Sequence, residues 1–101
     1  MGGDEGIGCH EVIFSGHALV RMFERSISRE DVLAVLEFGE VIADYPDDTP
    51  LPSCLMLGFV AGRPIHVVVA TEKERKLCII ITAYIPDPIL WNAGFRKRKS
   101  P

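Results

Sequence analysis

Three side chains able to do chemistry recur at helical spacing near the start of the chain. They are His17, Arg21 and Arg25, and an α-helix places residues four apart along one edge. An imidazole exchanges protons near neutral pH, and guanidinium groups bind phosphate oxygens or carboxylates. The spacing therefore predicts either a small metal-free nuclease site or an anion-binding site.

The same residues also have a plainer interpretation. Glu24 follows Arg21 by three residues, so these two side chains can form an ion pair on the helix surface. Arg25 can lay its aliphatic part over the edge of the core, as exposed arginines commonly do. Spacing alone does not separate a functional edge from a solvated one.

Two helices are expected to position this edge. Ser15 can cap the first, which should run to about Arg25 and bury its opposite side, formed by Leu19, Met22 and Phe23.

The second helix starts at Ser28, with Asp31 at the position that reaches back to the cap and with Ile27 and Val32 as a hydrophobic staple. Gly39 is expected to end it in a left-handed conformation.

After Gly39 the apolar pattern becomes that of strands. Four are expected, over residues 40–45, 54–60, 64–70 and 76–85. Ala61 and Gly62 predict a tight hairpin in which Gly62 takes a positive φ. The predicted architecture is α+β, with two N-terminal helices packed on one face of a roughly four-stranded antiparallel sheet.

The domain limits follow from composition. Residues 1–12 begin acidic and glycine-rich and are expected to form a flexible leader, while residues 13–95 form a single α+β domain. Residues 96–101 form a basic C-terminal tail. Trp91 and Phe95 are expected to fold the end of the domain back onto the sheet.

A second set of polar residues interrupts the apolar strands. His66 lies within one strand, and Thr82 and Tyr84 lie near the end of the last. Whether His66 and Tyr84 share a face depends on the register across the turn at 71–75, which the sequence does not fix. On the helix-facing side they would meet the edge formed by His17 and its two arginines, although a lone strand histidine is commonly structural.

Composition excludes several classes of protein. The chain has 101 residues, 48% hydrophobic and 25% charged, with a formal net charge of −3, as in one soluble globular domain. No apolar run approaches the ~20 residues that span a bilayer, and the acidic start is unlike a secretory signal. We therefore expect a cytoplasmic protein without a membrane segment.

The cysteines point the same way. Cys9, Cys54 and Cys78 are odd in number and widely dispersed, which is a poor disulfide framework and fits a reducing compartment. Cys78, within an apolar run, is expected to be a small core residue.

Charge is distributed unevenly along the chain. Residues 1–48 carry three basic and eleven acidic side chains, whereas residues 49–101 carry eight basic and three acidic ones. The basic end contains Arg96 and Lys97, which are candidates for contact with phosphates or with an acidic partner. A basic tail of this size also serves simply to keep a chain soluble.

Several segments resemble one prokaryotic family of domains of unknown function. Its pattern runs H-A-x-x-R-M-x-E-R, G-x-V-I, Y-P-D, G-R-P-x-H-V-V and I-I-T-x-Y. This chain has the corresponding residues at 17–28, 39–42, 45–47, 62–68 and 81–84. That family is grouped by fold with the RelE/BrnT-like toxins and small metal-independent ribonucleases, whose N-terminal helices pack on an antiparallel sheet. The resemblance points to the positions of His17, Arg21, Arg25, His66, Thr82 and Tyr84.

Two functions remain open. In the first, the domain is a toxin-type endoribonuclease in which His17 or His66 moves the proton and Arg21 and Arg25 stabilise the phosphorane. Tyr84 then orients the phosphate or stacks on a base. An antitoxin-like protein is the partner that this function implies. In the second, the domain is a non-catalytic anion- or protein-binding adaptor, which the acidic net charge favours.

The sequence predicts that the protein binds no metal and needs no cofactor. Its cysteines and histidines lack the close ligand pairs of zinc sites. Protein purified without added metal should therefore contain no stoichiometric zinc by mass spectrometry of the metal content. Zinc that disappears when Cys9 and His10 are replaced would contradict this.

Overall fold

A computed structural model describes residues 7–100 of the chain. It confirms the α+β class, with two helices and one sheet. The elements in chain order are β1 (Glu11–Phe14), α1 (Gly16–Glu24), α2 (Arg29–Phe38), β2 (Glu40–Tyr45), β3 (Ser53–Val60), β4 (Arg63–Glu72) and β5 (Leu77–Tyr84). Neither helix is long and apolar enough to cross a membrane within these residues.

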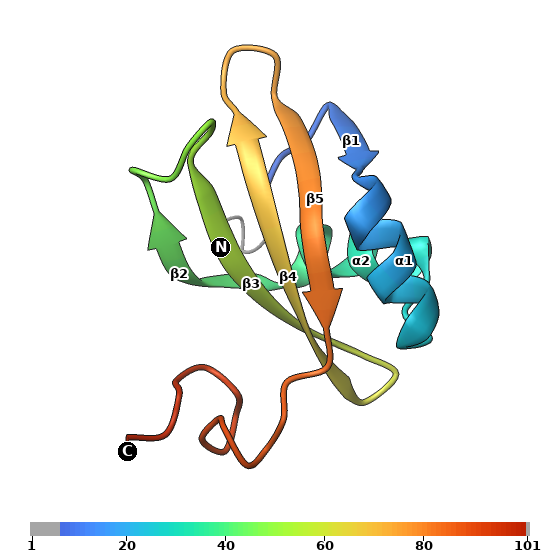
Figure 1. Cartoon of the computed structure of the whole chain (residues 1–101), viewed down its shortest axis with the longest axis vertical. Coiled ribbons are helices and arrows are strands. Elements are labelled where there is room, and N and C mark those ends of the chain that lie inside the picture. The colour runs from blue at the N-terminus through green and yellow to red at the C-terminus, as the bar shows by residue number, and fades with distance from the viewer. Residues whose placement is uncertain (1–6, 101) are drawn as a thin grey trace.

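The sheet has five strands and is mixed, which corrects the predicted four-stranded antiparallel sheet. Its order is β1-β5-β4-β3-β2, in which β2 to β5 form the predicted antiparallel meander (Figure 1). The additional strand, β1, pairs in parallel with β5, with Glu11 opposite Leu77. A four-residue strand whose partner lies near the other end of the chain leaves little periodic signal in the sequence.

Residues 7–12, expected to belong to a flexible leader, are part of this fold. The Ile7 N–H donates to the Leu36 carbonyl at 2.8 Å, and Cys9 forms a disulfide with Cys78. The pair contradicts the expectation drawn from dispersed cysteines, because the β1–β5 pairing brings the two residues together. The cysteines therefore no longer support a reducing compartment. The first six residues of the predicted leader lie outside the described residues.

Helix α1 lies along the edge of β5 beyond the end of β1 (Figure 1). Ser15 caps it as predicted, since its hydroxyl accepts from the Ala18 N–H at 3.0 Å, while the Ser15 N–H donates to the Ile80 carbonyl. Arg25, at the other end, donates to the Ala83 carbonyl at 3.0 Å. The residues that cap α1 at its two ends thus both bond to β5: Ser15 where the pairing with β1 ends at Ile80, and Arg25 beyond it, at Ala83. Phe23, expected on the buried side, is 88% exposed.

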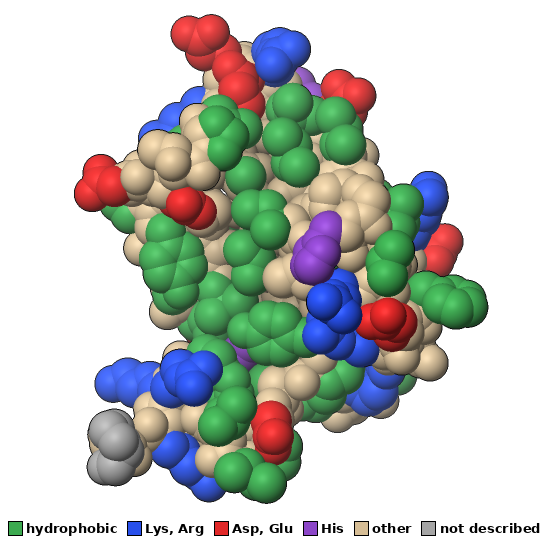
Figure 2. Space-filling model, viewed as in Figure 1, with side chains coloured by type: hydrophobic (Ala, Val, Ile, Leu, Met, Phe, Trp, Pro, Cys, Tyr) green, Lys and Arg blue, Asp and Glu red, His purple; other side chains and the backbone are tan. Residues whose placement is uncertain are grey.

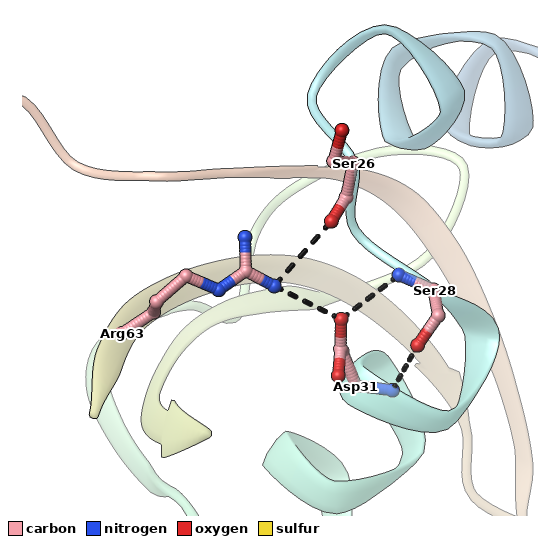
Figure 3. Close-up of polar contacts among 4 residues, drawn as sticks. All are labelled: Ser26, Ser28, Asp31 and Arg63. Atoms are coloured by element: carbon pink, nitrogen blue, oxygen red, sulfur yellow. Dashed lines mark hydrogen bonds and ion pairs between the residues drawn. The ribbon is translucent and has the colours of Figure 1, made fainter. Parts of the chain in front are cut away.

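Helix α2 begins at the predicted capping box. The Ser28 hydroxyl accepts from the Asp31 N–H, and the Asp31 carboxylate accepts from the Ser28 N–H, both at 3.0 Å. Arg63, at the start of β4, also donates to Asp31 at 3.1 Å and to the Ser26 carbonyl at 3.4 Å (Figure 3). The helix start is therefore tied to the sheet as well as capped.

Gly39 ends α2 as predicted, but in an extended conformation (φ −79°, ψ −175°) rather than a left-handed one. Glycine is needed there for space: a Cβ would lie 2.6 Å from the carbonyl oxygens of Val35 and Leu57. A Cβ on Gly58 of β3 would likewise lie 2.8 Å from the Val35 side chain. Two glycines therefore let α2 approach β3 closely. Gly62 does take the positive φ that the hairpin predicts (81°).

The sheet buries side chains on both faces. The helix-facing side carries the main core, with Met56, Ile65, Val67 and Ile80 fully buried among the helix residues. On the opposite face, Leu57 is buried where residues after β5 fold back, as Trp91 and Phe95 predict (Figure 1). This second, smaller layer contains the polar residues considered next.

The close approach at Gly39 leads to a direct test. Gly39→Ala should lower the free energy of unfolding by about 1–3 kcal/mol, because its methyl group meets rigid backbone carbonyls. Gly16→Ala is the matched control, since nothing lies within 4 Å of the Cβ that it adds. Urea unfolding of both variants measures the difference, and equal stabilities would contradict the packing described for Gly39.

Candidate functional site

His66 faces away from the helices. Its neighbours on β4, Ile65 and Val67, belong to the helix-side core, and successive strand residues point to opposite faces. Tyr84 lies directly across from His66 on β5, so both side chains share the opposite face. This answers the register question that the sequence leaves open: the pair does not face the helix side.

Both nitrogens of the His66 imidazole are hydrogen-bonded. Nε2 lies 2.9 Å from the Phe95 carbonyl oxygen, which only accepts, so Nε2 carries the hydrogen. In the neutral ring Nδ1 then accepts from the Tyr84 hydroxyl at 3.2 Å. The Trp91 ring packs edge-on against the imidazole, with 4.5 Å between the two ring centroids. The His66 side chain is fully buried (0% exposed). Burial lowers the pKa of His66, partly opposed by the bond to Phe95, which favours this neutral form.

The segment after β5 crosses a row of residues on this face. The row runs Tyr84, His66, Leu57 and Glu40, on β5, β4, β3 and β2. Glu40 accepts two hydrogen bonds from the Arg96 guanidinium, at 2.6 and 3.0 Å. These bonds lower the pKa of the Glu40 carboxyl, and partial burial acts in the opposite direction. The segment is thus held both at His66 and at Glu40.

Tyr84 is half-buried, and two arginines influence its hydroxyl. Burial raises the pKa of its hydroxyl, as does Tyr45, whereas Arg98 and Arg25 act to lower it. The phenol therefore stays neutral. Arg25 also bonds to the carbonyl of the preceding Ala83, and Arg98 lies over the Trp91 ring at 5.7 Å. We call Tyr84, His66, Arg25 and Arg98 the Tyr84 site.

The three side chains along the edge of α1, those of His17, Arg21 and Arg25, do not converge on one site. Arg21 pairs with Glu24 at 3.1 Å, which confirms the plainer interpretation of that residue. His17 is exposed and Arg25 turns to β5. In Figure 2 a histidine lies together with basic and acidic side chains near α1. Apolar side chains of the sheet face lie beside this group.

The remaining candidates are divided between the site and the surface. Thr82 is half-buried and pairs with Val68 on the same face as Tyr84. Arg96 is engaged by Glu40 and Lys97 is exposed. The structure thus brings Arg25, Thr82, His66 and Tyr84 to one region and leaves Arg21, Arg96 and Lys97 outside it.

Sequence reasoning did not single out Arg98. Its position in the basic block next to the predicted fold-back of Trp91 was the available signal. No cluster of three or more His, Cys, Asp or Glu suited to a metal occurs in the described part of the chain, and the absence of metal binding stays a prediction.

Comparison with known families matches residues 14–85 to a domain of unknown function, DUF4258. Because this match covers most of the chain, the protein belongs to that family. No curated protein and no solved structure matches the chain. The family match includes His17, His66 and Tyr84 and stops before the segment that carries Trp91 and Arg98.

The buried neutral His66 predicts a pH dependence of stability. Its folded-state pKa lies below the ordinary 6.5, so below that pH the unfolded chain binds more protons than the folded one. The free energy of unfolding should therefore fall as pH is lowered from about 7.5 to 5.5.

His66→Gln should flatten this dependence, whereas His17→Gln, which alters an exposed side chain, should preserve it. Urea unfolding across the pH range measures both. If His66→Gln does not fold, NMR titration of the wild-type His66 ring replaces it, and titration at or above pH 6.5 would contradict the assignment.

Proposed function

We propose that this DUF4258 domain is a metal-independent endoribonuclease of toxin type, with RNA phosphate held at the Tyr84 site. The observation that carries the proposal is the Tyr84 hydroxyl, hydrogen-bonded to a buried neutral imidazole. Arg25 bonds to the carbonyl of the neighbouring Ala83, and Arg98 lies over the Trp91 ring that packs on that imidazole. Such a hydroxyl can accept a proton beside a negatively charged substrate. The motif resemblance to the grouping that includes RelE/BrnT-like toxins supports the same reaction class.

The reaction is attack of a ribose 2′-hydroxyl on the adjacent phosphorus. The bond from the 2′ oxygen to phosphorus forms and the bond to the 5′ oxygen breaks, giving a 2′,3′-cyclic phosphate and a free 5′-hydroxyl. Because Tyr84 donates its own hydrogen to His66 Nδ1, its oxygen presents lone pairs outward. The 2′ proton passes to Tyr84 as the Tyr84 proton passes to His66.

The buried imidazole is arranged to hold that proton briefly. Protonated His66 would donate from Nδ1 to Tyr84 and from Nε2 to the Phe95 carbonyl, so neither hydrogen lacks a partner. Burial lowers the His66 pKa, which favours release of the proton again. His66 therefore acts through Tyr84 and does not touch RNA.

The two cations supply charge stabilisation. Arg25 and Arg98 lie close enough to Tyr84 to affect its pKa, and guanidinium groups match the geometry of phosphate oxygens. Preorganised cations stabilise the extra negative charge of the phosphorane more than that of the starting phosphate. His17, exposed on α1, is our candidate for the acid that protonates the leaving 5′ oxygen.

A non-catalytic protein-binding module is the second candidate. It is favoured by the apolar side chains that α1 presents to solvent, where Phe23 is 88% and Val20 is 56% exposed. Exposed apolar groups of this kind commonly mark sites of contact with other proteins. An antitoxin-like partner could use the same surface, so the two candidates differ chiefly in whether RNA is cut.

Cleavage of labelled single-stranded and ribosome-bound RNA in EDTA tests the proposal. Tyr84→Phe should lower the rate roughly 100-fold or more, because it removes the hydroxyl that passes the proton to His66. Arg98→Ala should weaken both binding and cleavage, with a smaller effect in high salt.

Arg75→Ala is the matched control, since Arg75 is an exposed arginine in the turn between β4 and β5, and its rate should equal that of the wild type. Circular dichroism and urea unfolding establish that each variant is folded. A folded wild-type protein that cuts neither substrate would exclude the nuclease and leave the binding module.

A further inference from the structure

The outer edge of β2 is open among the described residues. β2 is the last strand in the sheet order, and β3 pairs with only one side of it. The opposite edge of the sheet is formed by β1, which has only four residues. Beyond β1 the chain continues into α1, and Arg25 at the end of that helix bonds to β5. An open strand edge presents unpaired N–H and C=O groups to which another extended chain can add.

The strand and the residues that flank it in the sequence are acidic, and one basic residue, Lys73, lies near Val41 and Asp44 in the folded chain. Residues 37–62 include Glu37, Glu40, Asp44, Asp47 and Asp48 and contain no lysine or arginine. Glu40 already holds a guanidinium from a non-helical segment, since Arg96 donates two hydrogen bonds to it. The edge therefore has the charge to attract a basic chain, and Glu40 is an example of such a contact within the molecule.

Apolar side chains accompany both faces of the strand. Val41 pairs with Met56 of the helix-side core and is 44% exposed, whereas Tyr45 pairs with Ser53 and is 46% exposed. Phe38, just before the strand, is 68% exposed. An added strand would find apolar contact on each face as well as acidic groups.

Other occupants fit the edge less well. In a symmetric antiparallel pair of β2 strands centred on Ile42, Glu40 of one copy faces Asp44 of the other, and like charges directly opposite destabilise a sheet. The chain's own first six residues contain Asp4 and Glu5 and no basic side chain. Charge thus disfavours both a second copy and the N-terminal residues.

We infer that the outer edge of β2 takes an extended basic segment of a protein partner as an additional strand. Backbone hydrogen bonds to β2 provide register, and lysine or arginine side chains pair with Asp44 and Glu37. The register shift between Val41 and Ala43 limits the pairing to two short stretches on either side of Ile42. The inference concerns the outer edge of β2 and does not require that RNA is cut at Tyr84.

Selection of phage-displayed random dodecapeptides against the full chain tests the inference. Enriched sequences should alternate lysine or arginine with apolar residues. The synthetic consensus peptide, measured by calorimetry in about 0.15 M salt, should lose at least tenfold in affinity for the double variant Glu37→Lys/Asp44→Lys. The matched control, Glu30→Lys/Glu74→Lys, reverses two exposed acidic residues elsewhere and should bind within twofold of the wild type.

A second peptide separates strand addition from simple charge attraction. N-methylation of every second residue of the consensus peptide should weaken binding at least tenfold, and hydrogen exchange should slow at the amides of residues 40–45 when the unmethylated peptide binds.

Three results would each overturn the inference. They are enrichment of no basic sequence, binding that N-methylation leaves unchanged, and a concentration-dependent dimer in sedimentation experiments that Asp44→Lys alters. The last result would assign the edge to a second copy of this chain.

Discussion

A buried imidazole has two nitrogens, and each needs a hydrogen-bond partner when water is excluded. His66 meets this requirement with Tyr84 on one side and the Phe95 carbonyl on the other. The first bond fixes a side chain at the end of β5. The second fixes a segment that follows the last strand, so one residue joins the sheet to the end of the chain.

The same arrangement explains why the polar residues are concentrated on the face away from the helices. The helix-facing side is closed by α2, which approaches β3 closely at Gly39 and Gly58, and the core there is formed by hydrophobic side chains. The opposite face is covered only where Trp91 and the residues after it fold back. Tyr84 lies at the border of that cover and is half-buried, with Arg25 bonded to the carbonyl of the preceding residue and Arg98 over the Trp91 ring.

Local signals in the sequence predicted much of the fold. The capping box at Ser28, the hairpin at Gly62 and the meander from β2 to β5 depend on neighbouring residues, and all occur as expected. β1 and the Cys9–Cys78 disulfide were missed because they depend on pairing between the two ends of the chain. The face of His66 likewise depended on register, which is a property of two strands together. Gly39 ends α2 where the sequence predicts. Its glycine is required by close packing against β3 and not by a left-handed conformation, and such packing between distant residues leaves no local signal in the sequence.

The parallel pairing of β1 with β5 sets an order of events during synthesis. β1 is made first among the strands, but the residues it pairs with, Leu77 to Ile80, belong to β5, which is made last among them. Until they leave the ribosome, β1 and the cysteine before it have no native partner, whereas the hairpins of the meander can pair as they emerge. Nor can Ser15 and Arg25 reach their β5 carbonyls before then. β1 and the residues around it therefore become native only after β5 has been translated.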